Sequence, residues 1–373
     1  MTNHIVVLGA GYAGLGAAKR AARRLRRTDA RVTLVNASDR FVERVRLHQL
    51  AAGQRLPRLP LAGLLDGTGV ELVLARVIGL DPRARTVRLD APPYTLSYDA
   101  LVYALGSAAE LDAVPGVREH AYTVATADEA ARLRSRLAET GSVDVVGGGL
   151  TGIEAATEFA AARPSLRVRL VSSGLIGAGL SVRARRHLHR AFARMGIAVR
   201  EHAPVAKTGP DGLLLENGED LRTETVVWAA GFRVPGLAAT AGLATDEHGR
   251  MIVDGALRSV SHPEVFGIGD AATADRSGRP TRMACQTGLP MGLYAGEAVA
   301  DLLTGREPRP ARFRYVWQNI SLGRHDGVTQ FTRPDDTPTD AVLTGRASAA
   351  FKEAITRGTV WVMRHPGPWS SRP

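Results

Sequence analysis

Cysteine is nearly absent from this sequence, because Cys285 is the only one among 373 residues. A single thiol excludes an intrachain disulfide, a zinc site built from several thiolates and a Cys-x-x-Cys redox pair. We expect Cys285 to pack as a small apolar side chain, and we expect no metal site. This count removes the enzyme classes that depend on such groups.

Long apolar runs are missing as well. No stretch approaches the roughly 18 uninterrupted apolar residues that a membrane-spanning helix needs. The first four residues lead directly into the apolar segment 5–8, without the basic region or the cleavage site of a secretory signal. We therefore expect a cytoplasmic protein without a transmembrane segment, for which peripheral membrane contact is the less favoured alternative and a homodimer is an open one.

Lysine is almost absent, although the formal net charge is +11. Only Lys19, Lys207 and Lys352 are present, so arginine carries nearly all the positive charge. Arginine codons are rich in G and C, and a GC-rich genome explains this excess better than a face for nucleic acid. We expect no nucleic-acid partner.

An internal repeat is the strongest feature that is present. A predicted strand, a glycine loop and an Ala-rich helix occupy residues 5–25 and again 143–162. Each copy continues into a second strand, at 31–35 and at 166–171, as a βαβ unit requires. The predicted fold is therefore α/β, with two Rossmann-like dinucleotide-binding domains and a small C-terminal α+β module.

Further elements set the expected domain boundaries. Thr126 and Glu129 have the spacing of a capping box, which predicts the start of a helix. Other predicted strands are 70–77 and 86–89 (short and antiparallel), 98–106, 226–231 and 264–270, and, in the C-terminal module, 313–318 and 328–331 before a helix at 347–357. We expect a discontinuous first domain (1–112 and 246–309), a second domain (113–245) and a C-terminal interface module (310–373).

The glycine loops carry the binding chemistry. The first glycine makes the turn, the second lets backbone N–H groups approach a pyrophosphate, and the third lets helix and strand pack closely. The helix N-terminus adds the positive end of its dipole. The predicted binding residues are Gly9, Gly11, Tyr12, Ala13 and Gly14 in the first loop, and Gly147, Gly149, Thr151 and Gly152 in the second.

The acidic residue that grips ribose hydroxyls in many such sites is missing from both copies. Asn36 stands in its place in the first copy, where its amide can still bond a ribose. Ser172 stands there in the second, so that no carboxylate repels a 2′-phosphate, and three arginines follow between residues 183 and 186. Both NADH and NADPH therefore stay open.

Five motifs occur in an informative order: GAGYAG (9–14), YALGS (103–107), GGGLTGIEAA (147–156), VVWAAGF (226–232) and VFGIGDAA (265–272). Over residues 3 to about 300 they resemble the pyridine-nucleotide:flavin oxidoreductase family. The resemblance implies FAD on the first loop and NADH or NADPH on the second. It also implies cofactor contacts at Asp270, near the ribityl chain, and at Val77, Gly106, Gly231 and Gly269.

Residues 40–54 contain no cysteine where thiol-dependent members of that family carry one, so we expect no thiol relay. The chain is similar to type II NADH dehydrogenases, which pass electrons to quinone. By that resemblance His48 lies in the flavin-facing segment and Gln286 in the quinone-site helix. Pro290, however, stands where a second glutamine belongs, and the C-terminal membrane helices are shortened or absent.

Glu154, His48 and Gln286 are the candidate catalytic residues. Glu154, by the resemblance, lies against the nicotinamide; the alternative is a carboxylate that only favours the helix dipole. His48 is a candidate proton donor because the ordinary imidazole pKa is near neutrality. The predicted function is an FAD-dependent NAD(P)H dehydrogenase with a small-molecule acceptor. Open alternatives are a tailoring oxidoreductase acting on a small organic substrate and a nucleotide-sensing flavoprotein with little turnover.

Overall fold

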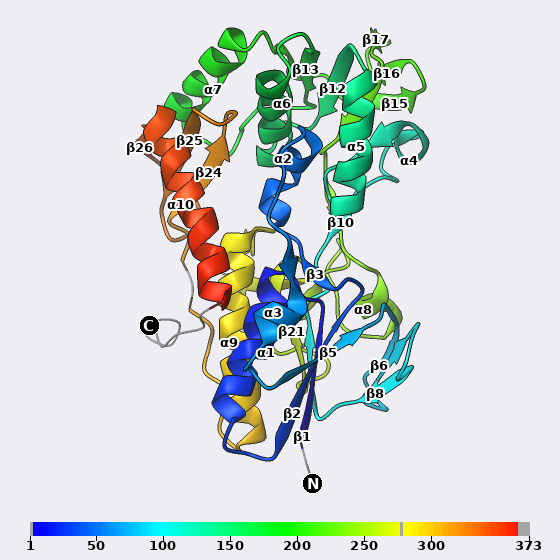
Figure 1. The fold of residues 1–373 in the computed structure, drawn as a ribbon, viewed down its shortest axis with the longest axis vertical. Helices are drawn as coiled ribbons and strands as arrows, with labels where there is room; N and C mark the ends of the chain where they lie inside the picture. Colours follow the sequence, from blue (N-terminus) through cyan, green and yellow to red (C-terminus); the bar gives the residue numbers. More distant parts are fainter. Residues whose placement is uncertain (1–2, 277–278, 313, 365–373) are drawn as a thin grey trace.

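Figure 1 shows the computed structural model, which describes residues 3–276, 279–312 and 314–364. The lower part is built on a five-stranded sheet of order β21-β9-β1-β2-β5, in which every pair is parallel. Its central strands are covered on both faces, which is why they read as continuous apolar runs. The strands are β1 (Asn3–Leu8), β2 (Ala30–Asn36), β5 (Val70–Leu74), β9 (Ala100–Tyr103) and β21 (Val265–Gly267).

Two long helices lie side by side against this sheet, α1 (Tyr12–Leu25) and α9 (Cys285–Leu303), as Figure 1 shows. Glycines in α9 permit the close approach. A Cβ added at Gly292 would lie 2.1 Å from the carbonyl oxygen of Ala13, and one at Gly296 would lie 2.7 Å from that of Ala17. The loop that begins α1 is thus held from behind by α9.

The expectation of short antiparallel strands is confirmed in part. β7 (Thr86–Leu89) pairs antiparallel with β6 (Val77–Asp81) and β8 (Thr95–Ser97). It is wrong for β5, which pairs in parallel with β2. β5 lies at the sheet edge with Leu74 half exposed, so it lacks the continuous apolar pattern by which an inner parallel strand is recognised.

A second parallel five-stranded sheet forms the upper part, in the order β11-β18-β12-β13-β14. The helix predicted from the capping box is confirmed, because the Thr126 side chain accepts a hydrogen bond from the Glu129 N–H at 3.2 Å. The elements are β11 (Ala121–Tyr122), β12 (Ser142–Val146), β13 (Arg167–Val171), β14 (Ala198–Arg200) and β18 (Thr225–Trp228), with α5 (Ala127–Glu139), α6 (Leu150–Ala162) and α7 (Val182–Arg194).

The connections between and around the two large sheets contain short helices and strands. They are β3 (Arg40–Phe41), η1 (Arg44–Arg46), α2 (Leu47–Ala51), β4 (Leu59–Pro60), α3 (Leu61–Leu65), β10 (Ala108–Ala109), α4 (Val117–His120), β15 (Val205–Gly209), β16 (Gly212–Leu215), β17 (Asp220–Arg222), β19 (Phe232–Arg233), α8 (Leu237–Thr240), β20 (Met251–Val253), η2 (Gly269–Ala271), β22 (Ala272–Arg276) and β23 (Arg279–Pro280).

The C-terminal module differs most from its prediction. It contains an antiparallel sheet of β24 (Trp317–Ser321), β25 (Gly327–Thr332) and β26 (Pro338–Thr344), of which β26 is not predicted. The first strand begins at Trp317, later than expected, and Phe313 lies outside the described residues. The helix is longer, since α10 spans Gly345–Arg364. Tertiary contact holds its last turns, because Met363 is buried and its carbonyl accepts a hydrogen bond from Lys19.

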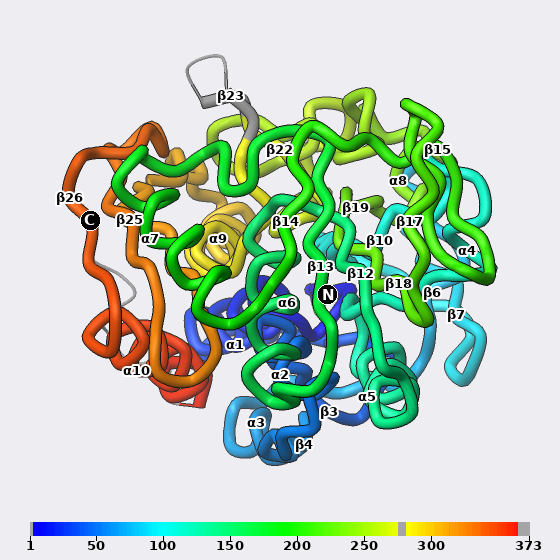
Figure 2. The backbone as a smooth tube through the Cα atoms, turned by 90° about the horizontal axis from the view of Figure 1, so that it is seen from above, coloured from blue at the N-terminus to red at the C-terminus, as the bar shows by residue number. Residues whose placement is uncertain are grey.

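All three parts of the chain contribute to one core around the upper sheet. Leu47 and Ala51 of α2 pack there, together with Ile320 and Leu322 of the C-terminal module. α2 lies against α5 and α6, as Figures 1 and 2 show. α2 therefore reaches from the first half of the fold into the core of the second.

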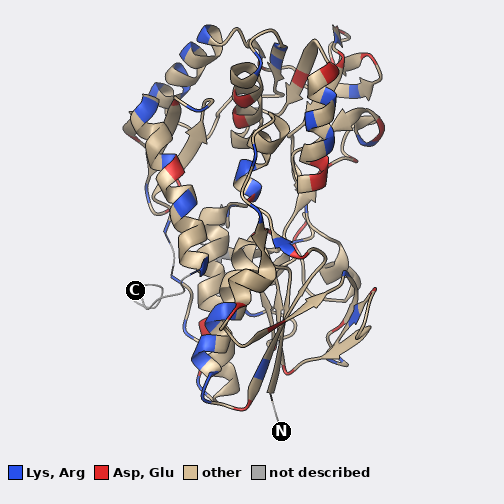
Figure 3. Cartoon of the chain, in the orientation of Figure 1, with Lys and Arg blue, Asp and Glu red and all other residues tan. Residues whose placement is uncertain are grey.

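Positive charge is spread over several helices, including α1, α7 and α10 (Figure 3). Within the residues that the structure describes, no helix combines the length and the apolar character needed to cross a membrane.

Candidate active site

One cavity of about 1240 Å³ lies between the two sheets and is lined by both glycine loops. Gly9 and Gly11 form its wall at one end, and Gly147 and Gly149 at the other. Its volume exceeds the range of about 300–1,000 Å³ that is usual for one small ligand. The repeat that the sequence predicts thus encloses a single continuous space.

The first loop is built so that its backbone faces this cavity. A Cβ added at Gly14 would lie 1.9 Å from the Gly9 carbonyl oxygen, so α1 can start this close to β1 only with glycine there. The Asn36 amide accepts a hydrogen bond from the Ala10 N–H at 2.9 Å and donates one to the Ser38 carbonyl at 2.7 Å. Asn36 lines the cavity, but its amide is already used to brace the loop.

Arg44 reaches the same wall and is not among the predicted residues. Its Nη1 donates to the Ser107 hydroxyl at 3.0 Å and lies 3.5 Å from Asp270 Oδ2. Its Nη2 is buried and has no hydrogen-bond partner among the described residues. Burial lowers the pKa of Arg44, an effect that Asp270 opposes. A buried guanidinium with an unused donor beside a glycine loop suits an anionic group such as a diphosphate.

The second loop repeats this construction. A Cβ added at Gly152 would lie 2.0 Å from the Gly147 carbonyl oxygen. Ser172 is buried at the cavity wall, and a Cβ at Gly148 would lie 2.4 Å from its Oγ. The three arginines between residues 183 and 186 lie on α7, outside the lining of the cavity. They therefore add nothing to the argument for a 2′-phosphate.

Glu154, in the first turns of α6, is held by the C-terminal module. Its Oε1 accepts hydrogen bonds from the Ser321 N–H at 2.9 Å and from the Ser321 hydroxyl at 3.2 Å, and it forms an ion pair with Lys352 of α10. His48 completes the cluster, with Nδ1 3.9 Å from Glu154 Oε2 and Nε2 3.4 Å from Ser321 Oγ. The helix dipole alone does not account for a carboxylate with these partners.

The electrostatics of the cluster favour Lys352 over His48 as its cation. Burial, together with the charge of Arg46, lowers the pKa of Lys352 to about 7, an effect that Glu353 opposes. Burial also takes the pKa of His48 well below its ordinary value, with Lys352 adding to the effect. The imidazole is therefore neutral at pH 7, whereas a proton is available on Lys352.

Most of the remaining predicted residues line the cavity, and three of them, Val77, Gly14 and Gly152, do not. Gln286 lines the cavity and accepts a hydrogen bond from Arg282 at 2.8 Å, and Cys285 beside it is half-buried, with its pKa raised by burial. Val77 lies in β6, outside the cavity lining. The other predicted residues that line the cavity are Tyr12, Ala13, Gly106, Thr151, Gly231, Gly269 and Asp270, whereas Gly14 and Gly152 pack behind their loops.

No group of three or more His, Cys, Asp or Glu side chains within the described ranges is arranged to hold a metal ion. The wall of the large cavity instead carries the Glu154–Lys352 ion pair.

Residues 3–292 match the protein family described as pyridine nucleotide-disulphide oxidoreductase. The chain belongs to this family. It is 35% identical over 347 residues to an NADH dehydrogenase-like protein of Mycobacterium tuberculosis, covering 87% of this chain and 86% of that protein. It is 25% identical over 399 residues to the type II NADH:quinone oxidoreductase of Staphylococcus haemolyticus, covering 96% and 95% of the two chains.

Solved structures share the fold. The sulfide:quinone oxidoreductase of Aquifex aeolicus superposes with a TM-score of 0.82 at 21% identity, covering 97% of this chain and 91% of that one. NDH2 of Plasmodium falciparum, in complex with NADH, has a TM-score of 0.80 at 15% identity, covering 100% and 99%.

The protein is thus an FAD-binding oxidoreductase that uses NADH or NADPH. The cavity fits such a group, because the first loop, the unused donor of Arg44 and Asp270 share one wall. Although the family is named for a disulphide, one cysteine leaves this chain no dithiol of its own.

Proposed function

We propose that this protein takes a hydride from NADH or NADPH and passes the electrons to a small-molecule acceptor such as a quinone, without a thiol relay. FAD supplies the two-electron chemistry when bound. The observation that carries the proposal is the continuous cavity that joins both glycine loops and has Glu154 and Lys352 in its wall.

Each part of the chain has a proposed task. The first loop, Arg44 and Asp270 hold FAD, and the second loop with Ser172 holds the nicotinamide nucleotide. We propose that residues 1–112 and 246–309 form the FAD-binding domain and that residues 113–245 form the NAD(P)H-binding domain. We propose that the C-terminal module, residues 310–373, closes the cavity. A cytoplasmic location and a homodimer stay predictions.

Lys352 is the proposed proton source for the reduced acceptor. Glu154 fixes the position of its ammonium group, and the Ser321 hydroxyl connects Glu154 to the neutral ring of His48. Proton delivery from a positioned group is typically worth about 10²–10⁴-fold in rate. Gln286 lines the same cavity and would contact the acceptor.

A small organic substrate is the second candidate for the acceptor. Pro290, which stands where the quinone-site resemblance requires glutamine, lies inside α9 and lines the cavity. A side chain without a donor at this place gives a quinone carbonyl one contact fewer.

Anaerobic reduction tests the proposal. The yellow flavin absorbance should be lost within minutes of adding NADH or NADPH, and oxygen-free addition of a soluble quinone should restore it. A flavin that neither nucleotide reduces would favour the nucleotide-sensing alternative. Reduced flavin that persists with quinone, but is oxidised by another acceptor in a panel of organic substrates, would remove the quinone assignment alone.

A further inference from the structure

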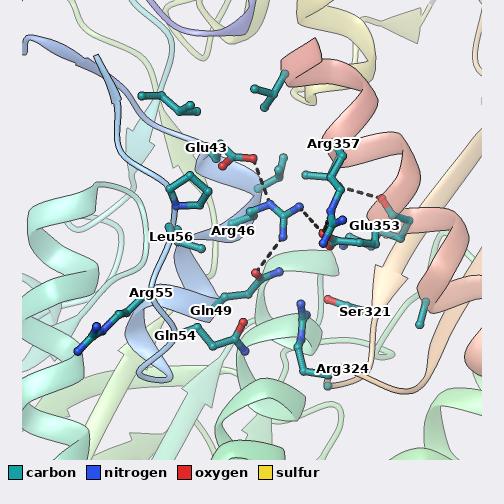
Figure 4. A pocket seen from close by; sticks show the side chains of 18 of the residues that line it. Glu43, Arg46, Gln49, Gln54, Arg55, Leu56, Ser321, Arg324, Glu353 and Arg357 are labelled. Atoms are coloured by element: carbon teal, nitrogen blue, oxygen red, sulfur yellow. Dashed lines mark hydrogen bonds and ion pairs between the residues drawn. The ribbon is translucent and has the colours of Figure 1, made fainter. Parts of the chain in front are cut away.

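A second cavity, of about 640 Å³, lies between the segment around α2 and the helix α10 (Figure 4). Both charged and apolar side chains line it. It shares Val45, Lys352 and Thr356 with the large cavity, so Lys352 borders both spaces. Nothing in the proposed hydride transfer uses this second space.

Positive charge dominates its lining. Six cationic side chains line it against two carboxylates, which are Glu43 and Glu353. Figure 4 shows Arg46, Arg324 and Arg357 grouped around the space, with Arg55 at its edge. The cations are Arg46, Arg55, Arg324, Lys352, Arg357 and Arg364.

Both carboxylates accept hydrogen bonds from arginines of the same lining. Arg46 donates to Glu43 at 3.1 Å and to Glu353 at 2.9 Å, and Arg357 donates to Glu353 at 2.7 Å. Although burial raises the pKa of Glu353, hydrogen bonds from Arg46 and Arg357 bring it below its ordinary value, so this carboxylate stays ionised. Neither carboxylate is free to bind a cationic ligand.

The cations, in contrast, have unused donors. A guanidinium presents five N–H groups, whereas, among the described residues, Arg357 makes one hydrogen bond, to Glu353, and Arg324 makes one, to Glu158 at 2.8 Å. Arg55 and Arg364 have no ion-pair partner in the part of the chain that the structure describes. The space thus keeps a positive potential and donors for a planar anion.

Apolar side chains form another part of the lining. Leu56, Pro57 and Leu59 line one side, and Val360 of α10 lines another. The volume falls within the range of about 300–1,000 Å³ that is usual for small-molecule sites. An inorganic ion would leave most of this space unfilled.

We propose that this second cavity binds an organic carboxylate, with the carboxylate against the arginines and an apolar body against Leu56, Pro57 and Val360. Charge-assisted hydrogen bonds from guanidinium to carboxylate supply the specificity. Because Lys352 borders both cavities, the bound carboxylate also favours the charged ammonium form of that residue. Binding at this site therefore strengthens the ion pair between Glu154 and Lys352.

Calorimetric titration of the flavin-loaded protein tests the site without any turnover, so that its failure is separate from a failure of the proposed function. The probes are 2-naphthoate and its uncharged isostere 2-naphthamide. We expect saturable binding of the carboxylate, and binding of the amide weaker by about tenfold or more.

Three variants locate the site. Arg357→Gln removes a cation whose side chain is largely exposed and should weaken 2-naphthoate binding by about tenfold. Glu353→Gln frees Arg46 and Arg357 and should tighten it. Arg346→Gln is the matched control, because Arg346 is exposed on the same helix and does not line the cavity.

The proposal is overturned if 2-naphthamide binds as tightly as 2-naphthoate, or if Arg357→Gln and Arg346→Gln bind alike. Inorganic phosphate that binds as tightly as 2-naphthoate would equally overturn it, since the apolar side chains of the lining would then contribute nothing.

Discussion

At the scale of single residues, the proposal depends most on Lys352. Lys352→Gln removes the ammonium that pairs with Glu154. We expect the rate of flavin reduction by NADH to change little, because hydride transfer needs no proton from a side chain. Oxidation of the reduced flavin by a soluble quinone should slow by about 10²-fold or more, because the reduced quinone takes up a proton. Stopped-flow absorbance measures both half-reactions.

Lys207→Gln is the control, since Lys207 is exposed in β15 and is not among the residues that line the cavity. An equal slowing of both half-reactions in Lys352→Gln would point to damaged cofactor binding, and an unchanged quinone step would remove Lys352 as the proton source.

The proton on Lys352 also predicts a pH dependence. Burial places the pKa of this residue at about 7, below its ordinary value, so the ammonium loses its proton as pH rises through neutrality. The quinone half-reaction should therefore slow between about pH 6 and pH 8, while reduction by NADH stays flat. A rate profile of Lys352→Gln should lack this step; a step retained in the variant would assign it to another group.

At the scale of elements, the two glycine loops are alike in geometry but predicted to differ in ligand. Gly14→Ala places a Cβ 1.9 Å from the Gly9 carbonyl oxygen, and Gly152→Ala places one 2.0 Å from that of Gly147. We expect Gly14→Ala to be purified without flavin. Gly152→Ala should keep its flavin and show a KM for NADH raised by about tenfold or more. Flavin content and steady-state kinetics measure the two effects.

Gly11→Ala and Gly149→Ala separate packing from ligand approach, because a Cβ at either position meets no atom within 4 Å. These variants should fold as the wild type and still lose affinity for flavin and NADH respectively. Loss of flavin in both Gly14→Ala and Gly152→Ala would show that the loops are not specialised in this way.

The elements also show how far sequence reasoning reaches. Both βαβ units, the capping box at Thr126 and the return of β21 to the first sheet are predicted, because each depends on a local pattern of residues. β26 and the last turns of α10 are not predicted, because their local sequence patterns are weak and tertiary packing stabilises them. Residues 358–362, which are Gly-Thr-Val-Trp-Val, are poor helix formers.

The same reason explains what is missed in the candidate site. Glu154 is found through the family resemblance of the segment that follows the second glycine loop, but its partner Lys352 lies 198 residues further along the chain. Only the fold brings them together. The sequence gives one indication of Lys352, because lysine is rare in a chain whose cations are nearly all arginine. It gives no such indication of Arg44, because arginines are abundant around that residue.

At the scale of the whole molecule, the shared core ties the parts of the chain to one another. Leu47 of α2 and Leu322 of the C-terminal module are each 1% exposed within the core around the upper sheet. Neither side chain belongs to the segment that forms that sheet. Loosening either of them should therefore weaken the second half of the fold as well as its own segment.

We expect Leu47→Ala and Leu322→Ala each to lower the free energy of unfolding by about 2–5 kcal/mol, through the lost apolar contact and the cavity left behind. Leu74→Ala, at a side chain that is 50% exposed, should change it by less than about 0.5 kcal/mol. Urea unfolding followed by far-UV circular dichroism and by flavin fluorescence should give coincident transitions for all three variants. If the two probes separate, so that flavin is released while most helix remains, the halves unfold independently and α2 does not couple them.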